Sequence, residues 1–271
     1  MTEVAPLYDW LSRYVQFANW RAYGDRYAGL TMHKPLAVGG TSAVNDHLFA
    51  AGGLLPGARV LDAGCGFGGT IFAFHERLGG PCDGLTLSRV QQRVATREAG
   101  RRGVASDCRF RVRSFDEPID SRYDAIVAIE TLVHSPDFAH SLANLAGALT
   151  PRGALLIVED VPAHSIDGTH DGDLLARHWA CPHLPTEDDY RDGFARERLT
   201  IEYEEDLTSL VRVRDARTID LLEERYARWY RRLPLAPARA VLAAYLGGLA
   251  IERLYANGKL RYRLFVARGS C

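Results

Sequence analysis

The chain has 271 residues, of which 47% are hydrophobic and 25% are charged. These values are typical of a globular protein with one large α/β domain, or with a core domain and an added cap. The 33 basic and 34 acidic residues give a formal net charge of -1. Electrostatics therefore give no reason to expect a nucleic acid or a membrane surface as partner.

The cysteines and the chain's apolar stretches indicate where the protein works. There are 5 cysteines and no C-x-x-C pair, which argues against a disulfide framework and against a zinc site. The N-terminus lacks the basic start and apolar run of a signal peptide, and no apolar stretch approaches the roughly 20 residues of a membrane helix. We expect a cytoplasmic protein without a bound metal. Its expected partner is a small molecule, and a homodimer remains an alternative.

Apolar runs of strand length alternate with helical stretches from residue 59 onward, which is typical of a mostly parallel sheet covered by helices on both faces. Strands are expected over residues 59–63, 82–87, 108–112, 123–129, 154–158, 199–207 and 259–267. Helices are expected over residues 70–78, 89–101, 139–149, 187–198 and 218–256. The turn Asn257-Gly258 before the last strand indicates an antiparallel strand at the edge of the sheet. The sequence therefore predicts a Rossmann-like α/β fold with seven strands.

Three segments lie outside this alternation. Residues 162–186 are rich in Gly, Asp and His and are expected to form a long loop or partial cap, and residues 216–256 a helical cap. Aromatic residues recur at roughly helical spacing near the N-terminus: Tyr8, Trp10, Tyr14, Phe17, Trp20, Tyr23 and Tyr27. Their rings either pack an N-terminal helix on the core or form a lid over a binding site. We predict a helical lid over residues 1–45, followed by the α/β domain over residues 46–271.

A glycine-rich loop follows the first expected strand, with the sequence Asp62-Ala63-Gly64-Cys65-Gly66-Phe67-Gly68. Glycines let the backbone turn tightly and approach a ligand, and the next helix points its N-terminus there. Dinucleotide sites use similar loops, but Asp62 within the motif and the absence of the third dinucleotide glycine distinguish this one. The string resembles motif I of class I S-adenosylmethionine-dependent methyltransferases. The resemblance implies that Asp62, Gly64, Gly66 and Gly68 bind the amino-acid end of S-adenosylmethionine.

The end of the second strand resembles a small-molecule subgroup of this family. Its string Leu85-Thr86-Leu87-Ser88, with Gln91 three residues later, is similar to tocopherol, sterol and mycolic-acid cyclopropane methyltransferases and to some antibiotic-sugar O-methyltransferases. The resemblance implies that Thr86 and Gln91 serve the ribose. Asp83 lies earlier in the strand and is interpreted as a surface charge.

The adenine edge is expected after the third strand. The family presents an acid there, whereas this chain has Ser114 at the aligned position and Asp116 two residues later. We assign Ser114 and Phe115 to the adenine edge, with Asp116 as the alternative. Ala128 on the fourth strand completes the predicted cofactor contacts.

Two catalytic candidates follow the fourth and fifth strands. His134 ends the string Glu130-Thr131-Leu132-Val133-His134, which resembles the family's E-S-x-x-H. It lies at the carboxyl edge where such sheets bind ligands, and its ordinary pKa suits a base that deprotonates the acceptor. Glu159 aligns better than its neighbour Asp160 with an acid of the sugar O-methyltransferases. The alternatives are a structural or cofactor-side hydrogen bond for His134, and solvated loop acids for the pair.

The residues and the resemblance together predict methyl transfer from S-adenosylmethionine to a small-molecule acceptor in natural product biosynthesis. Oxygen or nitrogen acceptors fit a histidine base. The alternatives are C-methylation of an isoprenoid or aromatic substrate, and a cyclase that binds S-adenosylmethionine without transferring methyl. A nicotinamide-dependent dehydrogenase and a nucleic-acid methyltransferase are disfavoured, the latter because no N/D-P-P-Y/F motif is present.

Two further clusters have more than one interpretation. The string Trp229-Tyr230-Arg231-Arg232 either holds a large aromatic or isoprenoid diphosphate acceptor or forms a solvated helical surface. Several histidines and aspartates of residues 164–178 are of the types that bind metal ions, but their spacings fit no compact set of metal ligands.

Overall fold

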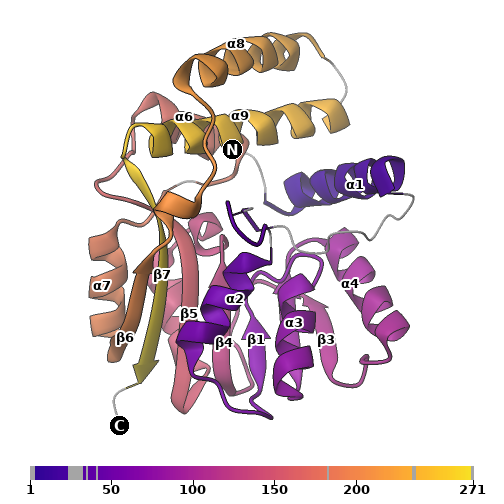
Figure 1. The fold of residues 1–271 in the computed structure, drawn as a ribbon, viewed down its shortest axis with the longest axis vertical. Coiled ribbons are helices and arrows are strands. Elements are labelled where there is room, and N and C mark those ends of the chain that lie inside the picture. The colour runs from indigo at the N-terminus through magenta and orange to yellow at the C-terminus, as the bar shows by residue number, and fades with distance from the viewer. Residues whose placement is uncertain are drawn as a thin grey trace.

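A seven-stranded sheet runs through the molecule, and helices cover both of its faces (Figure 1). This computed structural model describes residues 4–23, 33–34, 36–40, 42–181, 183–233 and 236–269. The strands are β1 Val60–Asp62, β2 Cys82–Thr86, β3 Cys108–Val112, β4 Tyr123–Ile129, β5 Leu149–Pro162, β6 Leu199–Asp206 and β7 Leu260–Gly269. Their order in the sheet is β3-β2-β1-β4-β5-β7-β6. The predicted Rossmann-like, mostly parallel sheet is confirmed.

The described helices follow the predicted alternation and add elements at both ends. They are α1 Val4–Tyr23, α2 Ala43–Gly52, α3 Gly69–Leu78, α4 Arg89–Arg102, α5 Phe138–Gly147, α6 His170–His178, α7 Glu187–Arg196, α8 Ala216–Arg232 and α9 Ala236–Ala256. Two short 3-10 helices are η1 Leu132–His134 and η2 Thr208–Leu210. None of the described helices is both long and apolar enough to span a membrane.

The core has one layer on each face of the sheet because strand residues alternate between the faces. On β4, Ala125 and Val127 belong to the layer that α2 and α3 complete, whereas Ile126 and Ala128 belong to the layer that α5 and α7 complete. All four strand residues are fully buried. Such near-continuous apolar runs are expected where both faces of a parallel sheet are covered.

The structure departs from three expectations about individual elements. The strand β7 is antiparallel as predicted, but it lies between β5 and β6 and not at the edge. The segment 162–186 is not only a loop, because Thr169 caps α6 by accepting the Gly172 N–H. The strand β5 begins at Leu149, which pairs with Tyr123 of β4, and runs to Pro162, so it is longer at both ends than the expected strand over residues 154–158.

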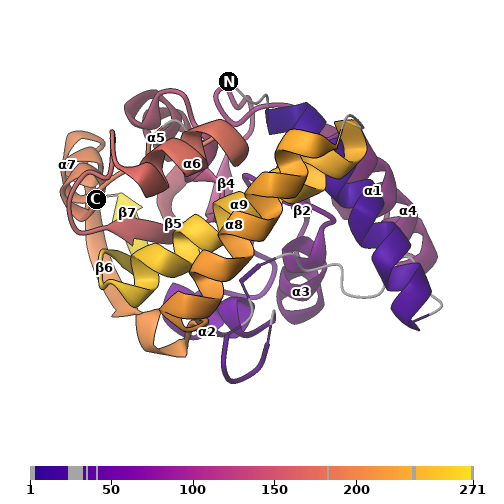
Figure 2. The same ribbon diagram turned by 90° about the horizontal axis from the view of Figure 1, so that it is seen from above.

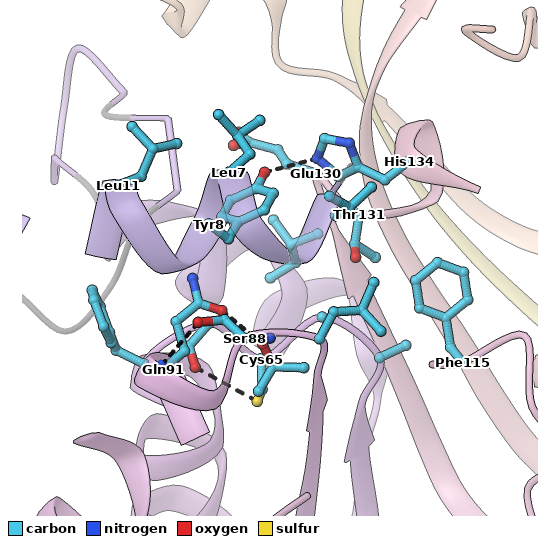
Figure 3. Close-up of a pocket in the computed structure, with 18 of the residues that line it drawn as sticks. Leu7, Tyr8, Leu11, Cys65, Ser88, Gln91, Phe115, Glu130, Thr131 and His134 are labelled. Atoms are coloured by element: carbon cyan, nitrogen blue, oxygen red, sulfur yellow. Dashed lines mark hydrogen bonds between the residues drawn. The ribbon is translucent and has the colours of Figure 1, made fainter. Parts of the chain in front are cut away.

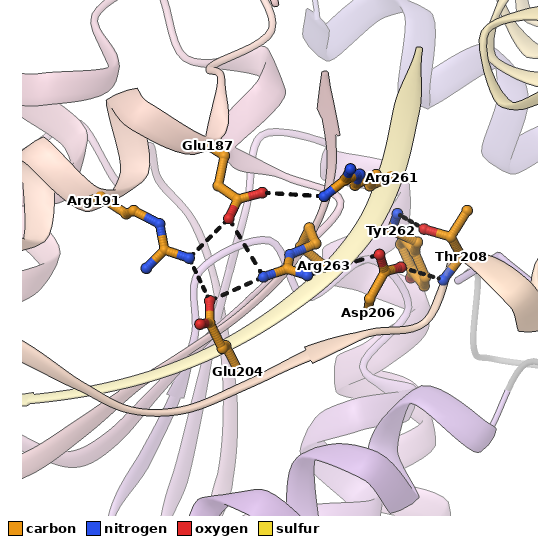
Figure 4. Close-up of polar contacts among 8 residues, drawn as sticks. All are labelled: Glu187, Arg191, Glu204, Asp206, Thr208, Arg261, Tyr262 and Arg263. Atoms are coloured by element: carbon orange, nitrogen blue, oxygen red, sulfur yellow. Dashed lines mark hydrogen bonds and ion pairs between the residues drawn. The ribbon is translucent and has the colours of Figure 1, made fainter. Parts of the chain in front are cut away.

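Ion pairs tie α7 to the antiparallel part of the sheet (Figure 4). The Arg263 guanidinium on β7 lies 2.9 Å from Glu204 and 3.5 Å from Glu187, and Arg191 of α7 contacts the same two carboxylates. The side chain of Arg263 is only 10% exposed, so these carboxylates neutralise a cation that burial would otherwise penalise.

The helices α1, α8 and α9 form a cap at one end of the molecule (Figures 1 and 2). α9 packs against α1, α6 and α8, and α1 also contacts α4. The predicted aromatic helix near the N-terminus is therefore present as α1. Tyr27 lies outside the described residues, and α2 crosses the predicted boundary at residue 45. The division into a lid and a domain stays a prediction.

Candidate active site

A cavity of about 250 Å³ lies where β1, β2, β3 and β4 end, with α1 and α9 on its other side (Figure 3). Its polar lining comes mainly from the strand ends, and the cap contributes mostly apolar residues. The apolar residues include Val4, Leu7, Leu11, Phe115, Ile129, Trp179 and Ala244. The cavity thus combines the carboxyl edge of the sheet, where ligands bind in such folds, with a largely apolar roof.

The residues of the glycine loop divide into two roles. Gly64 and Gly66 line the cavity, whereas Asp62 and Gly68 are not among its lining residues. Gly66 has φ +50°, and nothing lies within 4 Å of the place where a Cβ would stand. Gly68 has φ +87° and begins α3, and a Cβ there would lie 2.7 Å from the ring of Phe110. Gly66 therefore leaves space for a ligand, while Gly68 permits close packing.

Asp62 holds the glycine loop in place through a hydrogen bond, without lining the cavity. Its carboxylate accepts the Gly64 N–H at 3.2 Å, and burial raises the pKa of this carboxyl to about 7. A Cβ on Gly64 would lie 2.1 Å from the hydroxyl of Thr131. The close approach between the loop and the end of β4 therefore requires glycine at residue 64.

The predicted ribose contacts lie together at the end of β2. The Thr86 hydroxyl donates to Oε1 of Gln91 at 2.7 Å, and both residues line the cavity. Ser88 caps α4 by accepting the Gln91 N–H. Ser88 also donates to Asp9 of α1, which ties the cap to this strand end.

Replacing Gln91 with alanine should weaken binding of S-adenosylhomocysteine about threefold to tenfold. The expected loss is one hydrogen bond to a ribose hydroxyl, worth roughly 0.5–1.5 kcal/mol. Isothermal titration calorimetry measures the change. Gln92→Ala is the matched control, because Gln92 is the next residue of α4 but does not line the cavity. Equal affinities of the two variants would mean that Gln91 faces away from the ribose.

The predicted adenine edge also borders the cavity. Ser114, Phe115 and Asp116 all line it. The Ser114 hydroxyl donates to Asp116 at 3.0 Å and accepts the Asp116 N–H at 3.0 Å. Ser114 and Asp116, the two alternatives for the adenine contact, therefore lie side by side at the cavity.

His134 and Tyr8 of α1 form a hydrogen-bonded pair in the wall of the cavity. The Tyr8 hydroxyl lies 2.7 Å from Nε2 of His134, and Nδ1 lies 3.3 Å from the carbonyl oxygen of Ala180. Because that carbonyl can only accept, Nδ1 carries the proton and Nε2 accepts from the Tyr8 hydroxyl. Burial lowers the pKa of His134 and raises that of Tyr8. Both side chains are therefore neutral near pH 7.

Glu159 does not line the cavity, and it holds the turn that carries His134. It is fully buried, and its Oε1 accepts the N–H groups of Thr131 and Leu132, each at 2.7 Å. Burial raises the pKa of Glu159 well above its usual range. Ala128, predicted as a cofactor contact, is likewise buried in β4 and does not line the cavity.

The Glu159 carboxyl should make stability depend on pH. Its raised pKa means that the folded chain still holds this proton at pH values where the unfolded chain, with a pKa of about 4.5, has lost it. The free energy of unfolding should therefore fall as pH rises from 5 to 8, and Glu159→Gln should remove that part of the slope. Glu159→Ala should lower the free energy of unfolding by about 2–4 kcal/mol, because two buried N–H groups lose their acceptor. Urea denaturation at several pH values measures both effects, and an unchanged slope in Glu159→Gln would contradict the assignment.

Glu130 lines the cavity, although it was not among the candidate residues expected from the sequence. It follows β4 with φ +50°, a conformation rare outside glycine and frequent at functional sites. Its carboxylate accepts the Lys34 N–H at 3.1 Å and the Tyr262 hydroxyl at 2.7 Å. The charges of Lys34 and His33 and the Tyr262 hydrogen bond outweigh burial and lower the pKa of Glu130. Its place at a strand end, the signal used for His134, could have identified it.

The ammonium of Lys34 lies between the carboxylates of Glu130 and Asp160. It lies 2.6 Å from Asp160 and 3.7 Å from Glu130, and the Lys34 side chain is 15% exposed. The ring of Tyr262 lies 4.6 Å from the ammonium, within the range of a cation–π contact. The predicted acid Asp160 thus holds Lys34 and does not line the cavity.

The other predicted clusters lie away from the cavity. His170 pairs with Glu223 at 2.9 Å, and the ring of His178 packs on Tyr230. Within the described part of the chain, no three His, Cys, Asp or Glu side chains are grouped as metal ligands. Trp229, Tyr230, Arg231 and Arg232 belong to α8 and do not line the cavity.

Comparisons with known proteins agree with the fold and the loop. Geranyl diphosphate C-methyltransferase from Streptomyces coelicolor A3(2) superposes with a TM-score of 0.70 at 18% identity, covering 100% of both chains. The cyclopropane synthase MmaA2 from Mycobacterium tuberculosis gives 0.68 at 21% identity, covering 88% of this chain and 90% of that one. The 4+2 cyclase SpnF gives 0.73 at 18% identity, covering 98% and 94%. The fold is therefore the Rossmann-like methyltransferase fold.

The sequence comparisons identify the family. Residues 41–182 match the mycolic acid cyclopropane synthetase family, and the chain belongs to it. Tocopherol O-methyltransferase from Arabidopsis thaliana is 33% identical over 102 residues, which are 37% of this chain and 29% of that protein. Geranyl diphosphate 2-C-methyltransferase from Saccharopolyspora erythraea is 48% identical over 65 residues, 24% of this chain and 22% of that protein. The chain thus matches less than a third of the length of these two relatives.

Proposed function

We propose that this chain transfers a methyl group from S-adenosylmethionine to a small, largely apolar acceptor. One observation carries the proposal: a single cavity borders the glycine loop and the Thr86–Gln91 pair at one side and the Tyr8–His134 pair at another. The first group fits the cofactor because the backbone at Gly66 is open and polar side chains lie where the ribose is expected. S-adenosylmethionine supplies a methyl group on a sulfonium that needs no further activation.

Proximity accounts for much of the expected rate. Methyl transfer is an in-line displacement, and aligned reactants gain several kcal/mol over free encounter. The cavity of about 250 Å³ is small beside typical ligand pockets of roughly 300–1,000 Å³. An outward movement of α1 would make room for cofactor and acceptor together, in keeping with its predicted role as a lid.

The Tyr8–His134 pair can remove the proton that the acceptor loses. Nε2 of His134 already accepts the Tyr8 hydroxyl, so the acceptor's proton passes to Tyr8 Oη while the tyrosine's own proton passes to Nε2. When bound, S-adenosylmethionine would supply the methyl group and keep the electron pair of the broken sulfur–methyl bond, and the acceptor's proton would end on His134. Tyr8 and His134 act here as one catalytic unit.

A carbon acceptor is favoured by Glu130 and the aromatic rings. Methylation of an alkene leaves a carbocation, which an ionised carboxylate and ring faces stabilise. Glu130 is ionised and lines the same cavity as Tyr8, Phe115 and Trp179. This proposal agrees with the geranyl diphosphate C-methyltransferase that matches the whole chain in fold. It departs from the oxygen or nitrogen acceptor expected from His134 alone.

The test uses S-adenosylmethionine with a trideuterated methyl group and three acceptor panels: prenyl diphosphates, phenols and amines. We expect S-adenosylhomocysteine together with a methylated prenyl product. Glu130→Gln should lower kcat about tenfold to hundredfold on an alkene because a charge facing the cation is lost. A phenol or amine product with an unaffected Glu130→Gln variant would assign an oxygen or nitrogen acceptor. A rearranged product with S-adenosylmethionine recovered intact would assign the cyclase alternative.

A further inference from the structure

The cap carries a positive charge that the whole-chain balance conceals. α1 has two arginines and one acid, α8 has five arginines and three acids, and α9 has two arginines and one acid. The three helices together are therefore at +4, in a chain whose formal net charge is -1. Figures 1 and 2 show the three helices at the same end of the molecule.

Several of these arginines are not neutralised by the protein. Arg225, Arg228 and Arg232 of α8 are exposed, and none of them forms an ion pair among the described residues. Arg191, by contrast, is paired with two carboxylates in the cluster of Figure 4. The unpaired arginines of the cap are free to meet an external anion.

Aromatic side chains, most of them exposed, lie on the same three helices, and Arg225 lies over the rings of two of them. This set, the cap ridge, consists of Phe17, Tyr14, Tyr245, Tyr226 and Trp229. The rings of Tyr226 and Tyr245 are 5.3 Å apart, and those of Tyr226 and Trp229 are 6.1 Å apart. A hydrogen bond with Tyr14 raises the pKa of Tyr245 to about 12, which joins α1 to α9. Phe17 is 57% and Trp229 46% exposed.

The cap ridge leads to the cavity. Leu7 and Leu11 of α1 line the cavity, and Tyr14 follows them on the same stripe of the helix. On α9, the cavity residue Ala244 directly precedes Tyr245 of the ridge. The seam between α1 and α9 therefore begins at the cavity roof and ends at the exposed rings.

We propose that the cap ridge and its arginines dock the protein on an anionic lipid surface. Amphipathic helices with Trp or Tyr among arginines bind in the interface of anionic membranes. A second copy of this chain fits less well, because a two-fold interface would bring the same unpaired arginines together. An apolar acceptor dissolved in lipid would then reach the cavity along the α1–α9 seam. The expectation of no membrane partner rested on total charge, which does not describe how the charge is distributed.

Vesicle sedimentation tests the docking. Vesicles with one third phosphatidylglycerol in phosphatidylcholine should bind the protein, pure phosphatidylcholine should bind it much less, and 500 mM NaCl should release it. Arg225→Glu/Arg228→Glu should lower the partition coefficient at least about tenfold, because two attractions become repulsions. Anionic vesicles should also shift the tryptophan emission to the blue, and Trp229→Phe should lose most of that shift.

Arg152→Glu/Arg196→Glu is the matched control, since it makes the same change of charge at exposed residues outside the cap. An equal loss of binding in the control, or equal binding to neutral vesicles, would overturn the proposal. So would a concentration-dependent dimer in analytical ultracentrifugation that the cap variant abolishes, because the ridge would then belong to a second copy. S-adenosylmethionine binding of each variant, measured by calorimetry, should be unchanged. Lipid docking and the proposed function can therefore fail independently.

Discussion

Replacing Gly66 with valine is expected to abolish S-adenosylmethionine binding and leave the fold intact. Gly66 lines the cavity, and the space that its Cβ would occupy is free of protein atoms. The valine side chain would therefore fill space that the cofactor needs. Calorimetric titration should show at least a hundredfold loss of affinity, and circular dichroism should show an unchanged spectrum.

Gly103→Val separates the loss of cofactor space from backbone strain. Gly103 ends α4 with φ +73°, has nothing within 4 Å of its Cβ position and does not line the cavity. A branched side chain in this left-handed region costs roughly 1–2 kcal/mol at either residue. Both variants should therefore lose similar stability, and only Gly66→Val should lose binding. Cofactor binding by Gly66→Val with wild-type affinity would remove the loop from the proposed site.

Removing either member of the Tyr8–His134 pair is expected to lower kcat by about 10²–10⁴, the usual contribution of a positioned base. Tyr8→Phe removes the hydroxyl that receives the acceptor's proton, and His134→Ala removes the nitrogen that completes the transfer. The double variant should be little slower than either single variant, because the two groups act as a unit. Single-turnover assays at saturating cofactor measure these rates. Wild-type rates in Tyr8→Phe would exclude the relay.

The pH profile provides an independent test of the pair. His134 must be neutral to accept a proton, and burial lowers its pKa below the ordinary 6.5. The wild-type rate should therefore stay constant from pH 8 down to about 6.5 and fall only at lower pH. Cofactor affinity should change little in either variant. A rate that already falls between pH 8 and 7 would contradict a histidine in this environment.

The residues assigned to the cofactor side could be expected at one place in the fold because their signals are local. The loop after β1, the Thr86–Gln91 pair and the Ser114–Phe115 edge each follow one strand within a few residues, and all three border the cavity. Parallel strands bring such ends to the same edge of the sheet. The structure refined the roles: Asp62 and Gly68 shape the loop, and Glu159 holds the turn before His134.

On the acceptor side, His134 was predicted from its place after β4 but its partner Tyr8 was not, because the contacts there join distant parts of the chain. Tyr8 and His134 are 126 residues apart, as are Lys34 and Asp160. No local pattern marks Lys34, which is stabilised only where β4, β5 and β7 bring Glu130, Asp160 and Tyr262 together. The helix α6 was missed because its Gly and Asp residues resemble a loop.

Asp83 shows the same limitation within one strand. It was interpreted as a surface charge, which is wrong: it is 5% exposed and accepts the Tyr123 hydroxyl at 2.9 Å. Arg59 also donates to it at 3.1 Å. A polar residue on a buried strand needs such partners, and the partners come from β4 and from the chain just before β1. Single-strand patterns do not contain that information.

The rate at which the buried ammonium of Lys34 reacts should report how often residues 33–34 separate from the sheet. Lysine occurs only at Lys34 and Lys259 in the sequence, and Lys259 is exposed. An amine-selective acylating reagent should modify Lys259 at the rate of a free amine, whereas Lys34 must first leave Asp160 and Glu130. The half-time of Lys34 acylation, followed by peptide mass spectrometry, therefore measures how often residues 33–34 leave the sheet edge. Because His33 lines the cavity, saturating ligand should lengthen that half-time while Lys259 keeps its own.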